Sequence, residues 1–258
     1  GAPAVALELR AGFRLGAWAS VGSTRDEARR LAEAGAPDGT AVWAREQTQG
    51  RGRQGRGWTS PRGNLYLTLL LRPRGSALAA AQLGFAAGLA LAEAVAPLLP
   101  PGRVALKWPN DLLVDGAKAA GMLLESRATV VNGGGVEWLL LGMGVNLAAA
   151  PAPGETPYRA TSLAAACGRA VPPEDLIPPL LARFAHWRQC LDSEGFAPLR
   201  GAWVALAAGI GGPMTARLPR ASLSGVFWDL DEDGALILEA PGGQRQRITA
   251  ADVFFGQA

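Results

Sequence analysis

The pattern of apolar residues changes once along this chain of 258 residues, near Gly209. Before that point, strand-like and helix-like runs alternate, and after it only short strand-like runs occur. These later runs lie at residues 213–218, 223–230, 235–239 and 244–249. The pattern predicts an α+β protein with a mixed-sheet core and flanking helices in residues 1–208, followed by a small β-barrel unit in residues 209–258. Because so small a barrel has a thin core, it should dock on the larger unit.

The core is expected to combine several strands with one long, apolar helix. Thr24 and Glu27 have the spacing of a capping box, so a helix should run from there to about Ala34, with Gly35 as its stop. Further helices are expected at residues 76–98, 162–166, 174–191 and 196–207, and strands at 40–44, 65–71, 104–108, 118–125 and 136–142. Residues 131–134 have the composition of a hairpin turn.

Composition and charge exclude several classes of protein. Hydrophobic residues make up 49% and charged residues 18%, which is too apolar for a disordered chain. The net charge of +3 is too small to make the whole surface a nucleic-acid binder. Cys167 and Cys190 have no CxxC spacing, which argues against a disulfide framework and a thiolate metal site. The one histidine, His186, has no metal or triad signature beside it, so we expect a packing or surface role.

Neither an export signal nor a membrane span is expected. Residues 1–9 lack the basic region of a signal peptide. The longest Ala- and Leu-rich stretch, residues 76–99, is interrupted by Gln82 and Glu93, so it falls short of the ~20 clean apolar residues of a membrane span. We therefore expect a soluble protein of the cytoplasm.

The most distinctive segment is residues 47–58, QTQGRGRQGRGW. Its glycines form a literal GxGxxG, which suggests a dinucleotide site. That interpretation fails on context, because the next element is the strand at 65–71 rather than a helix. The first carboxylate after the motif is Glu93, which is also too distant for a dinucleotide fold.

The arginines of this loop indicate an anion site instead. Glycines let the backbone N–H groups surround an anion, and Arg51, Arg53 and Arg56 supply planar donors for carboxylate and phosphate oxygens. From Arg45 to Arg62, five arginines and one glutamate give a local charge of +4. Such a loop is expected to be mobile until it orders over a polyanionic ligand. A solvated basic loop that touches nucleic acid without specificity remains the alternative.

Two further motifs lie at the ends of predicted strands. In residues 107–111, KWPND, the proline ends the strand and leaves Asn110 and Asp111 behind it. This pair, with the motif's lysine and Lys118, suits phosphates and Mg²⁺, while a plain Asx turn is the structural alternative. In residues 142–146, GMGVN, the glycines mark a β-bulge or let a flat ligand ring lie on the backbone.

These motifs, in this order along the chain, resemble those of the biotin protein ligases. The shared pieces are Ser23-Thr24, the QTxGRGRxGRxW loop, KWPND, KxxGxLxE from Lys118 to Glu125, and GxGVN. The likeness runs from about Trp18 to Phe255. It implies a class II synthetase-like core followed by an SH3-like β-barrel. Lipoate ligases and octanoyltransferases share the fold, so an enzyme of their type is the alternative function.

The resemblance implies a monofunctional, ATP-dependent ligase. Biotin is activated as biotinyl-5′-AMP, and the biotinyl group then passes to one lysine of a biotin carboxyl carrier protein, such as that of acetyl-CoA carboxylase. Biotin, ATP and Mg²⁺ are the implied ligands. No helix-turn-helix precedes Val5, so specific DNA binding is not expected. A homodimer is left open.

The family's functional residues carry over position by position. Residues implied to bind biotin are Ser23, Thr24, Arg25, Gln47, Gly50, Arg51, Gly52, Arg53, Lys118, Gly121 and Gly142. Residues implied to bind ATP are Arg53, Arg56, Trp58, Lys107, Asn110, Asp111, Lys118 and Asn146. The chemistry is implied for Lys118, Arg51, Arg53 and Asp111, and Mg²⁺ binding for Asn110 and Asp111. For Trp58, a plain core role is the alternative.

Two positions depart from the family pattern. Arg25 stands where many relatives have asparagine, which puts an expected neutral contact in doubt. Residues 148–159 contain no tryptophan to cover adenine, so this second loop over the site should work differently.

Overall fold

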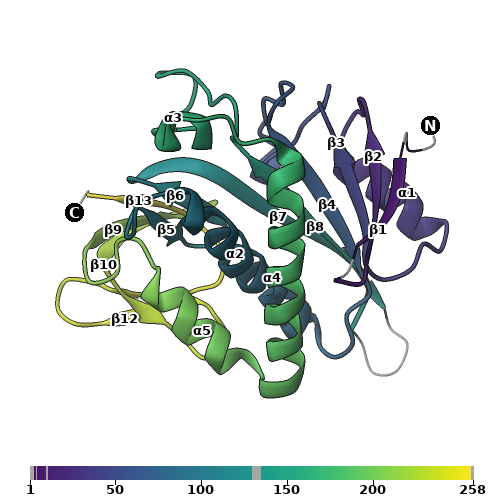
Figure 1. Cartoon of the computed structure of the whole chain (residues 1–258). Helices are drawn as coiled ribbons and strands as arrows, with labels where there is room; N and C mark the ends of the chain where they lie inside the picture. The colour runs from purple at the N-terminus through teal and green to yellow at the C-terminus, as the bar shows by residue number, and fades with distance from the viewer. Residues whose placement is uncertain (1–2, 4, 10, 130–134, 257–258) are drawn as a thin grey trace.

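Two sheets organise the chain in the computed structural model, which describes residues 3, 5–9, 11–129 and 135–256 (Figure 1). The larger sheet has eight strands in the order β1-β2-β3-β4-β8-β7-β6-β5. They are β1 Val5–Leu9, β2 Phe13–Trp18, β3 Thr40–Ala44, β4 Leu65–Leu71, β5 Val104–Lys107, β6 Asp111–Val114, β7 Ala117–Thr129 and β8 Gly135–Val145. Strands β2 and β3 pair in parallel and the other neighbours antiparallel, so the sheet is mixed, as predicted.

Strand β4 shows how this sheet divides the core. All seven of its residues are buried; Leu65, Leu67, Leu69 and Leu71 belong to one apolar cluster, and Leu70, on the opposite face, belongs to a second. Leu67 and Leu69 pack with residues of α2 (Ala77–Val95) and α4 (Pro173–Glu194), whereas Leu70 packs with residues of α1 (Thr24–Glu33). The sheet therefore carries α2 and α4 on one face and α1 on the other (Figure 1).

Helix α1 begins one residue earlier than the capping-box spacing predicts. Its N-cap is Ser23, whose Oγ accepts from the backbone N–H of Arg25 at 3.2 Å. Thr24 cannot cap the helix because its hydroxyl is bonded to Gln47 and Thr68. The prediction of Thr24 as the cap is therefore wrong, whereas Gly35, with φ +83°, follows the helix end as expected.

Helix α2 is the apolar helix predicted at residues 76–98. Ser76 caps it, and a 3₁₀ turn, Ala96–Leu98, extends it. By length and composition, Ala77–Leu98 could cross a membrane, with a mean hydropathy of 1.6. However, 67% of that stretch is buried inside the protein, as in the central helix of a globular core.

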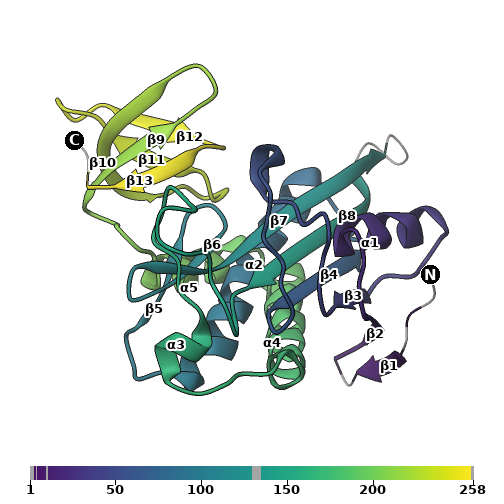
Figure 2. The same ribbon diagram turned by 90° about the horizontal axis from the view of Figure 1, so that it is seen from above.

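The smaller sheet has five antiparallel strands in the order β12-β11-β10-β9-β13. They are β9 Pro213–Arg217, β10 Ser222–Leu230, β11 Leu236–Glu239, β12 Arg245–Ile248 and β13 Asp252–Phe255. Figure 2 shows this sheet beside β5, β6 and α5 (Phe196–Ala205). Trp108 Nε1 donates to the carbonyl of Gly234 at 3.1 Å, and Arg200 pairs with Asp229 at 2.6 Å. The small unit is therefore docked on the large one, as its thin core predicts.

Most predicted elements are present with shifted ends, but β1, β2, β6 and β13 have no counterpart in the sequence patterns. Strands β6 and β13 have four residues each, as do β5, β11 and β12, so length alone does not explain why they were missed. The strand predicted to reach Trp108 ends at Lys107, and Asp111 already opens β6. Cys167 and Cys190 are free and lie on α3 (Leu163–Cys167) and α4. The predicted turn at 131–134 lies outside the described residues, although its flanking strands β7 and β8 do pair.

Candidate active site

The candidate site is a cavity of about 330 Å³ on the α1 side of the larger sheet. Strand register places Tyr66 of β4, Gly144 of β8, Gly121 of β7 and Asp111 of β6 in one row across the sheet. Because the two central positions are glycines, the backbone itself forms the floor of the cavity. Gly142, two residues along β8 on the same face, extends this bare floor.

Nearly all of the predicted site residues line this cavity. They are Ser23, Thr24, Arg25, Gln47, Arg51, Gly52, Arg53, Arg56, Trp58, Lys107, Asn110, Asp111, Lys118, Gly121 and Gly142. Gly50 and Asn146 do not line it. Asn146 is buried and its Nδ2 donates to the carbonyl of Thr161 at 3.2 Å, so it holds the loop between β8 and α3 in place.

One end of the cavity carries a chain of uncharged polar groups. The Thr24 hydroxyl lies 2.8 Å from that of Thr68 and donates to Gln47 Oε1 at 3.1 Å. The Thr24 backbone N–H donates to the same oxygen at 2.9 Å. Gln47 Nε2 donates to Ser60 Oγ at 3.0 Å, and that hydroxyl donates to the carbonyl of Trp58 at 2.8 Å. These five residues, the polar chain, connect the sheet to the arginine-rich loop.

Gly50 is required by the polar chain rather than by a ligand. A Cβ at this position would lie 2.3 Å from the carbonyl oxygen of Trp58 and 2.4 Å from Ser60 Oγ. The Gly50 carbonyl also accepts from the backbone N–H of Trp58 at 2.9 Å, which closes the base of the loop. The loop glycine therefore permits close packing of two backbone segments.

The indole of Trp58 covers the bare floor. A Cβ built on Gly144 would lie 2.7 Å from Trp58 Nε1, and one on Gly121 would lie 3.4 Å from the same ring. The Nε1 atom is buried and has no hydrogen-bond partner among the described residues. Trp43 and Trp138 of the core have unpaired Nε1 atoms too, so this feature alone does not separate a ligand contact from a plain core role for Trp58.

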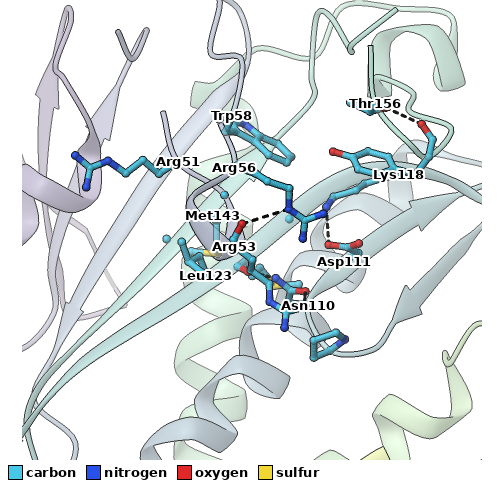
Figure 3. Close-up of a pocket in the computed structure, with 18 of the residues that line it drawn as sticks. Arg51, Arg53, Arg56, Trp58, Asn110, Asp111, Lys118, Leu123, Met143 and Thr156 are labelled. Carbon is cyan, nitrogen blue, oxygen red and sulfur yellow. Dashed lines mark hydrogen bonds and ion pairs between the residues drawn. The ribbon is translucent and has the colours of Figure 1, made fainter. Parts of the chain in front are cut away.

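Lys118 lies at the other end, where the cavity becomes charged (Figure 3). Its Nζ is 2.8 Å from Asp111 Oδ1, and the two side chains are only 14% and 16% exposed. The ammonium also lies 4.8 Å from the ring centroid of Tyr158 and 5.4 Å from that of Trp58. A single, shielded positive charge thus sits between two aromatic rings beside the cavity floor.

Lys107 adds a second ammonium from the end of β5. It lies 5.7 Å and 5.4 Å from the ring centroids of Phe254 and Phe255 in β13. Burial lowers the pKa of Lys107, and the charge of Lys118 lowers it further, while Asp111 and Asp252 oppose the shift. The smaller sheet therefore supplies part of the wall around this charge.

The three loop arginines divide into two directions. Arg53 and Arg56 pair with Asp252 of β13, with Nη–Oδ distances of 3.4 Å and 3.0 Å. Arg51 points away from them towards α1, where it pairs with Asp26 at 3.3 Å (Figure 3). The structure thus brings Arg53 and Arg56 together at the charged end and leaves Arg51 apart. All three arginines form ion pairs within the protein.

Arg25 does not leave an unpaired charge in the neutral end of the cavity. Its Nε lies 3.3 Å from Glu125 Oε2, and Glu125 is also bound by Arg29 at 2.7 Å. Arg25 is therefore in an ion pair with a carboxylate that it shares with Arg29.

Asn110 and Asp111, the predicted Mg²⁺ ligands, already have partners within the protein. Asn110 Nδ2 donates to the carbonyl of Met122, and its Oδ1 faces Arg53 at 3.4 Å. Asp111 is bound to Lys118. Within the described part of the chain there is no group of three or more His, Cys, Asp or Glu side chains that could hold a metal. The donors present fit only an ion that arrives with phosphate and water ligands of its own.

The sequence patterns miss several residues of the cavity wall. They are Tyr66, Thr68, Met122, Leu123, Met143, Glu155, Tyr158, Asp252 and Phe254. Tyr66 and Thr68 reach the wall only because strand β4 alternates, which a uniformly apolar run conceals. Tyr158 provides the aromatic side chain in the loop of residues 148–159, which has no tryptophan.

Comparison with known proteins agrees with the fold. Residues 19–146 match the sequence model of the Biotin/lipoate A/B protein ligase family, and residues 209–256 match that of the biotin protein ligase C-terminal domain. The fold and site therefore define a protein ligase of the biotin/lipoate class, with a synthetase-like mixed sheet followed by an SH3-like small unit. More narrowly, the chain belongs to the biotin protein ligase family.

Three relatives illustrate that membership. The chain is 50% identical to a biotin–acetyl-CoA-carboxylase ligase of Paracoccus denitrificans, over 91% of this chain and 97% of the relative. It is 34% identical to the bifunctional ligase/repressor BirA of Bacillus subtilis, over 91% of this chain and 71% of that protein. The biotin protein ligase of Aquifex aeolicus, solved with biotin and ATP, superposes with a TM-score of 0.79 at 27% identity, covering 94% of this chain and 99% of that one.

Proposed function

We propose that this chain is an ATP-dependent ligase that activates biotin as biotinyl-5′-AMP and transfers the biotinyl group to a lysine of a biotin carboxyl carrier protein. The observation that carries the proposal is the polarity gradient along one cavity. Uncharged hydrogen-bonding groups stand at one end, a glycine floor beneath an indole lies in the middle, and ammonium and guanidinium groups stand at the other end. This order matches a neutral ureido ring, an apolar chain and a carboxylate that meets phosphates. The names of the relatives support the same activity.

In the first step, a biotin carboxylate oxygen attacks the α-phosphorus of ATP. The new O–P bond forms as the bond to the β-phosphate oxygen breaks, and pyrophosphate leaves. Both reactants are anions, so fixed positive charge must offset their repulsion. We assign Lys118 to the carboxylate and α-phosphate, and Arg53, Arg56 and Lys107 to the phosphates. Arg51 would join the site only after leaving Asp26.

In the second step, the carrier lysine attacks the carbonyl carbon of the mixed anhydride. A C–N bond forms, the C–O bond to phosphate breaks, and AMP leaves. The attacking amine must be neutral and must lose a second proton as the amide forms. Asp111 is the carboxylate at the charged end of the floor, and we assign it to that proton once the substrates have drawn Lys118 away. Asn110, which holds the turn before β6 through Met122, is a positioning residue.

Mg²⁺ belongs to the proposal as an ion bound chiefly by the triphosphate. When bound, it would supply charge neutralisation, with Asp111 or Asn110 Oδ1 as its protein ligand. We also propose 1–208 as the catalytic unit, 209–258 as the small unit, and a cytoplasmic location, and we leave monomer and homodimer as the two alternatives for the assembly. Light scattering on the purified chain tests the homodimer.

Biotin-dependent exchange of label between pyrophosphate and ATP tests the proposed function. We expect exchange with biotin, none without it, and biotinyl-AMP in the intact-mass spectrum of the protein incubated with biotin and MgATP. Lipoate in place of biotin is the discriminating arm. Exchange with lipoate alone would establish the alternative activity, and exchange with neither acid would refute both.

A further inference from the structure

The carboxylate of Asp252 faces the charged end of the cavity from the smaller sheet. Arg56 Nη2 donates to both of its oxygens, at 3.1 Å and 3.0 Å, and Arg53 Nη1 donates to one of them at 3.4 Å. Asp252 is 18% exposed, whereas Arg56 is 49% exposed. One shielded carboxylate from β13 thus engages two arginines of a loop about 200 positions earlier in the chain.

We propose that Asp252 is a positioning residue that holds Arg53 and Arg56 over the cavity and competes with phosphate groups for them. The inference rests on the proposed function, which assigns the same two arginines to the phosphates of ATP. A carboxylate offers guanidinium groups paired oxygens, as a phosphate does, so the two anions seek the same donors. Asp252 therefore keeps the loop in place while lowering its affinity for polyphosphates.

The competition has a use in the reaction. Pyrophosphate leaves after the first step, and a carboxylate that recaptures the arginines favours its departure. ATP would also bind through its adenosine part, so it can retain a useful affinity after the same fold loss. Asp252 thereby weakens binding of the product pyrophosphate and of free phosphates at the charged end.

Asparagine at position 252 removes the charge while keeping the shape. Arg53 Nη1 retains two neutral acceptors, the carbonyl of Ala251 at 3.2 Å and Asn110 Oδ1 at 3.4 Å. Among the described residues, the guanidinium of Arg56 keeps its contact with the carbonyl of Arg53 at 3.3 Å and can otherwise use only the amide oxygen of the new asparagine. We therefore expect the loop to keep its base and Arg56 to become freer.

The test measures pyrophosphate binding by calorimetry with the full chain, without biotin or ATP. Asp252→Asn should bind pyrophosphate about three- to tenfold more tightly than the wild type, as expected for the loss of two partly exposed ion pairs. Trypsin should cut the free variant faster after Arg56, and saturating pyrophosphate should protect it. Asp252→Glu, which keeps the charge, should restore an affinity within about twofold of the wild type.

Asp229→Asn is the matched control, because it removes another aspartate of the smaller sheet that pairs with an arginine of the larger unit, Arg200 at 2.6 Å, away from the cavity. Its pyrophosphate affinity should not change. Equal or weaker binding by a folded Asp252→Asn, or equal tightening by both variants, would overturn the inference. Because no biotin is present, this result is independent of exchange, so failure of the proposed function would be recognised separately.

Discussion

Replacing Lys118 separates its contribution to folding from its contribution to chemistry. At 2.8 Å, the Lys118–Asp111 pair has a Coulomb attraction of about 6 kcal/mol at an effective dielectric constant of ~20, before desolvation is subtracted. Both side chains are largely shielded, so removing the ammonium leaves a carboxylate without its counter-charge. We expect Lys118→Met to lower the free energy of unfolding by about 2 kcal/mol, equivalent to a fall in Tm of about 4–8 °C.

A double-mutant cycle checks this magnitude. Urea unfolding of Lys118→Met, Asp111→Asn and the double variant should give a coupling energy of about 1–3 kcal/mol, with the double variant more stable than Lys118→Met. Pyrophosphate exchange should be lost in both variants that lack the lysine, whatever their stability. A coupling below about 0.5 kcal/mol would refute the structural role. Normal exchange in Lys118→Met would remove the residue from the reaction.

Three further substitutions test other parts of the site. Gly50→Ala should lower the free energy of unfolding by about 1–3 kcal/mol and lower the exchange rate, because its Cβ would lie 2.3 Å from a backbone oxygen of the same loop. Gly201→Ala, whose Cβ would have no atom within 4 Å, is the control in urea unfolding and in the exchange assay. Asn64→Ala should destabilise by about 2–4 kcal/mol in urea unfolding, since its Oδ1 accepts the N–H groups of residues 147–149 at 2.9–3.0 Å, and unchanged stability would contradict this. Lys107 has a lowered pKa, so the unfolded chain binds its proton more readily and stability should rise with pH from that lowered value towards 10.5. Lys107→Met should therefore raise Tm at pH 7, and thermal melts at higher pH should show a smaller rise in Tm. The same rise in Tm at every pH would refute burial of the ammonium as the cause.

The elements and residues that could be predicted from the sequence share a local origin. The strand at residues 65–71 is an unbroken apolar run, and the helix after it is long enough for its pattern to be evident. The loop arginines and the KWPND motif stand out because charge and proline are conspicuous among apolar segments. Each of these signals lies within one continuous segment of the chain, of 19 residues in the case of α2.

What could not be predicted depends on pairing between distant segments. Thr68 enters the cavity wall because β4 lies beside β8 in one particular register, and a slip of one residue would have turned it into the opposite core. Asp252 reaches the loop only because the smaller sheet docks beside β5 and β6, and Asp252 begins a four-residue strand with no signal of its own. The misassigned cap of α1 has the same cause, because the Thr24 hydroxyl is bonded to Gln47 of the loop after β3 and to Thr68 of β4.

The polar chain fixes which way round the amide of Gln47 stands. Its Oε1 accepts two hydrogens from Thr24, so turning the amide over would set its NH₂ group against another N–H and leave both donors unpaired. The end of the cavity therefore presents a fixed arrangement of hydroxyl and amide groups, of which those of Thr24 and Thr68 are buried. A ring of similar size without hydrogen-bonding groups, such as a dithiolane, would offer no partner to the donors and acceptors that this arrangement leaves over. If biotin binds here as proposed, we expect a dithiolane to be discriminated against by the hydrogen bonds that it fails to make, rather than by a clash or a charge.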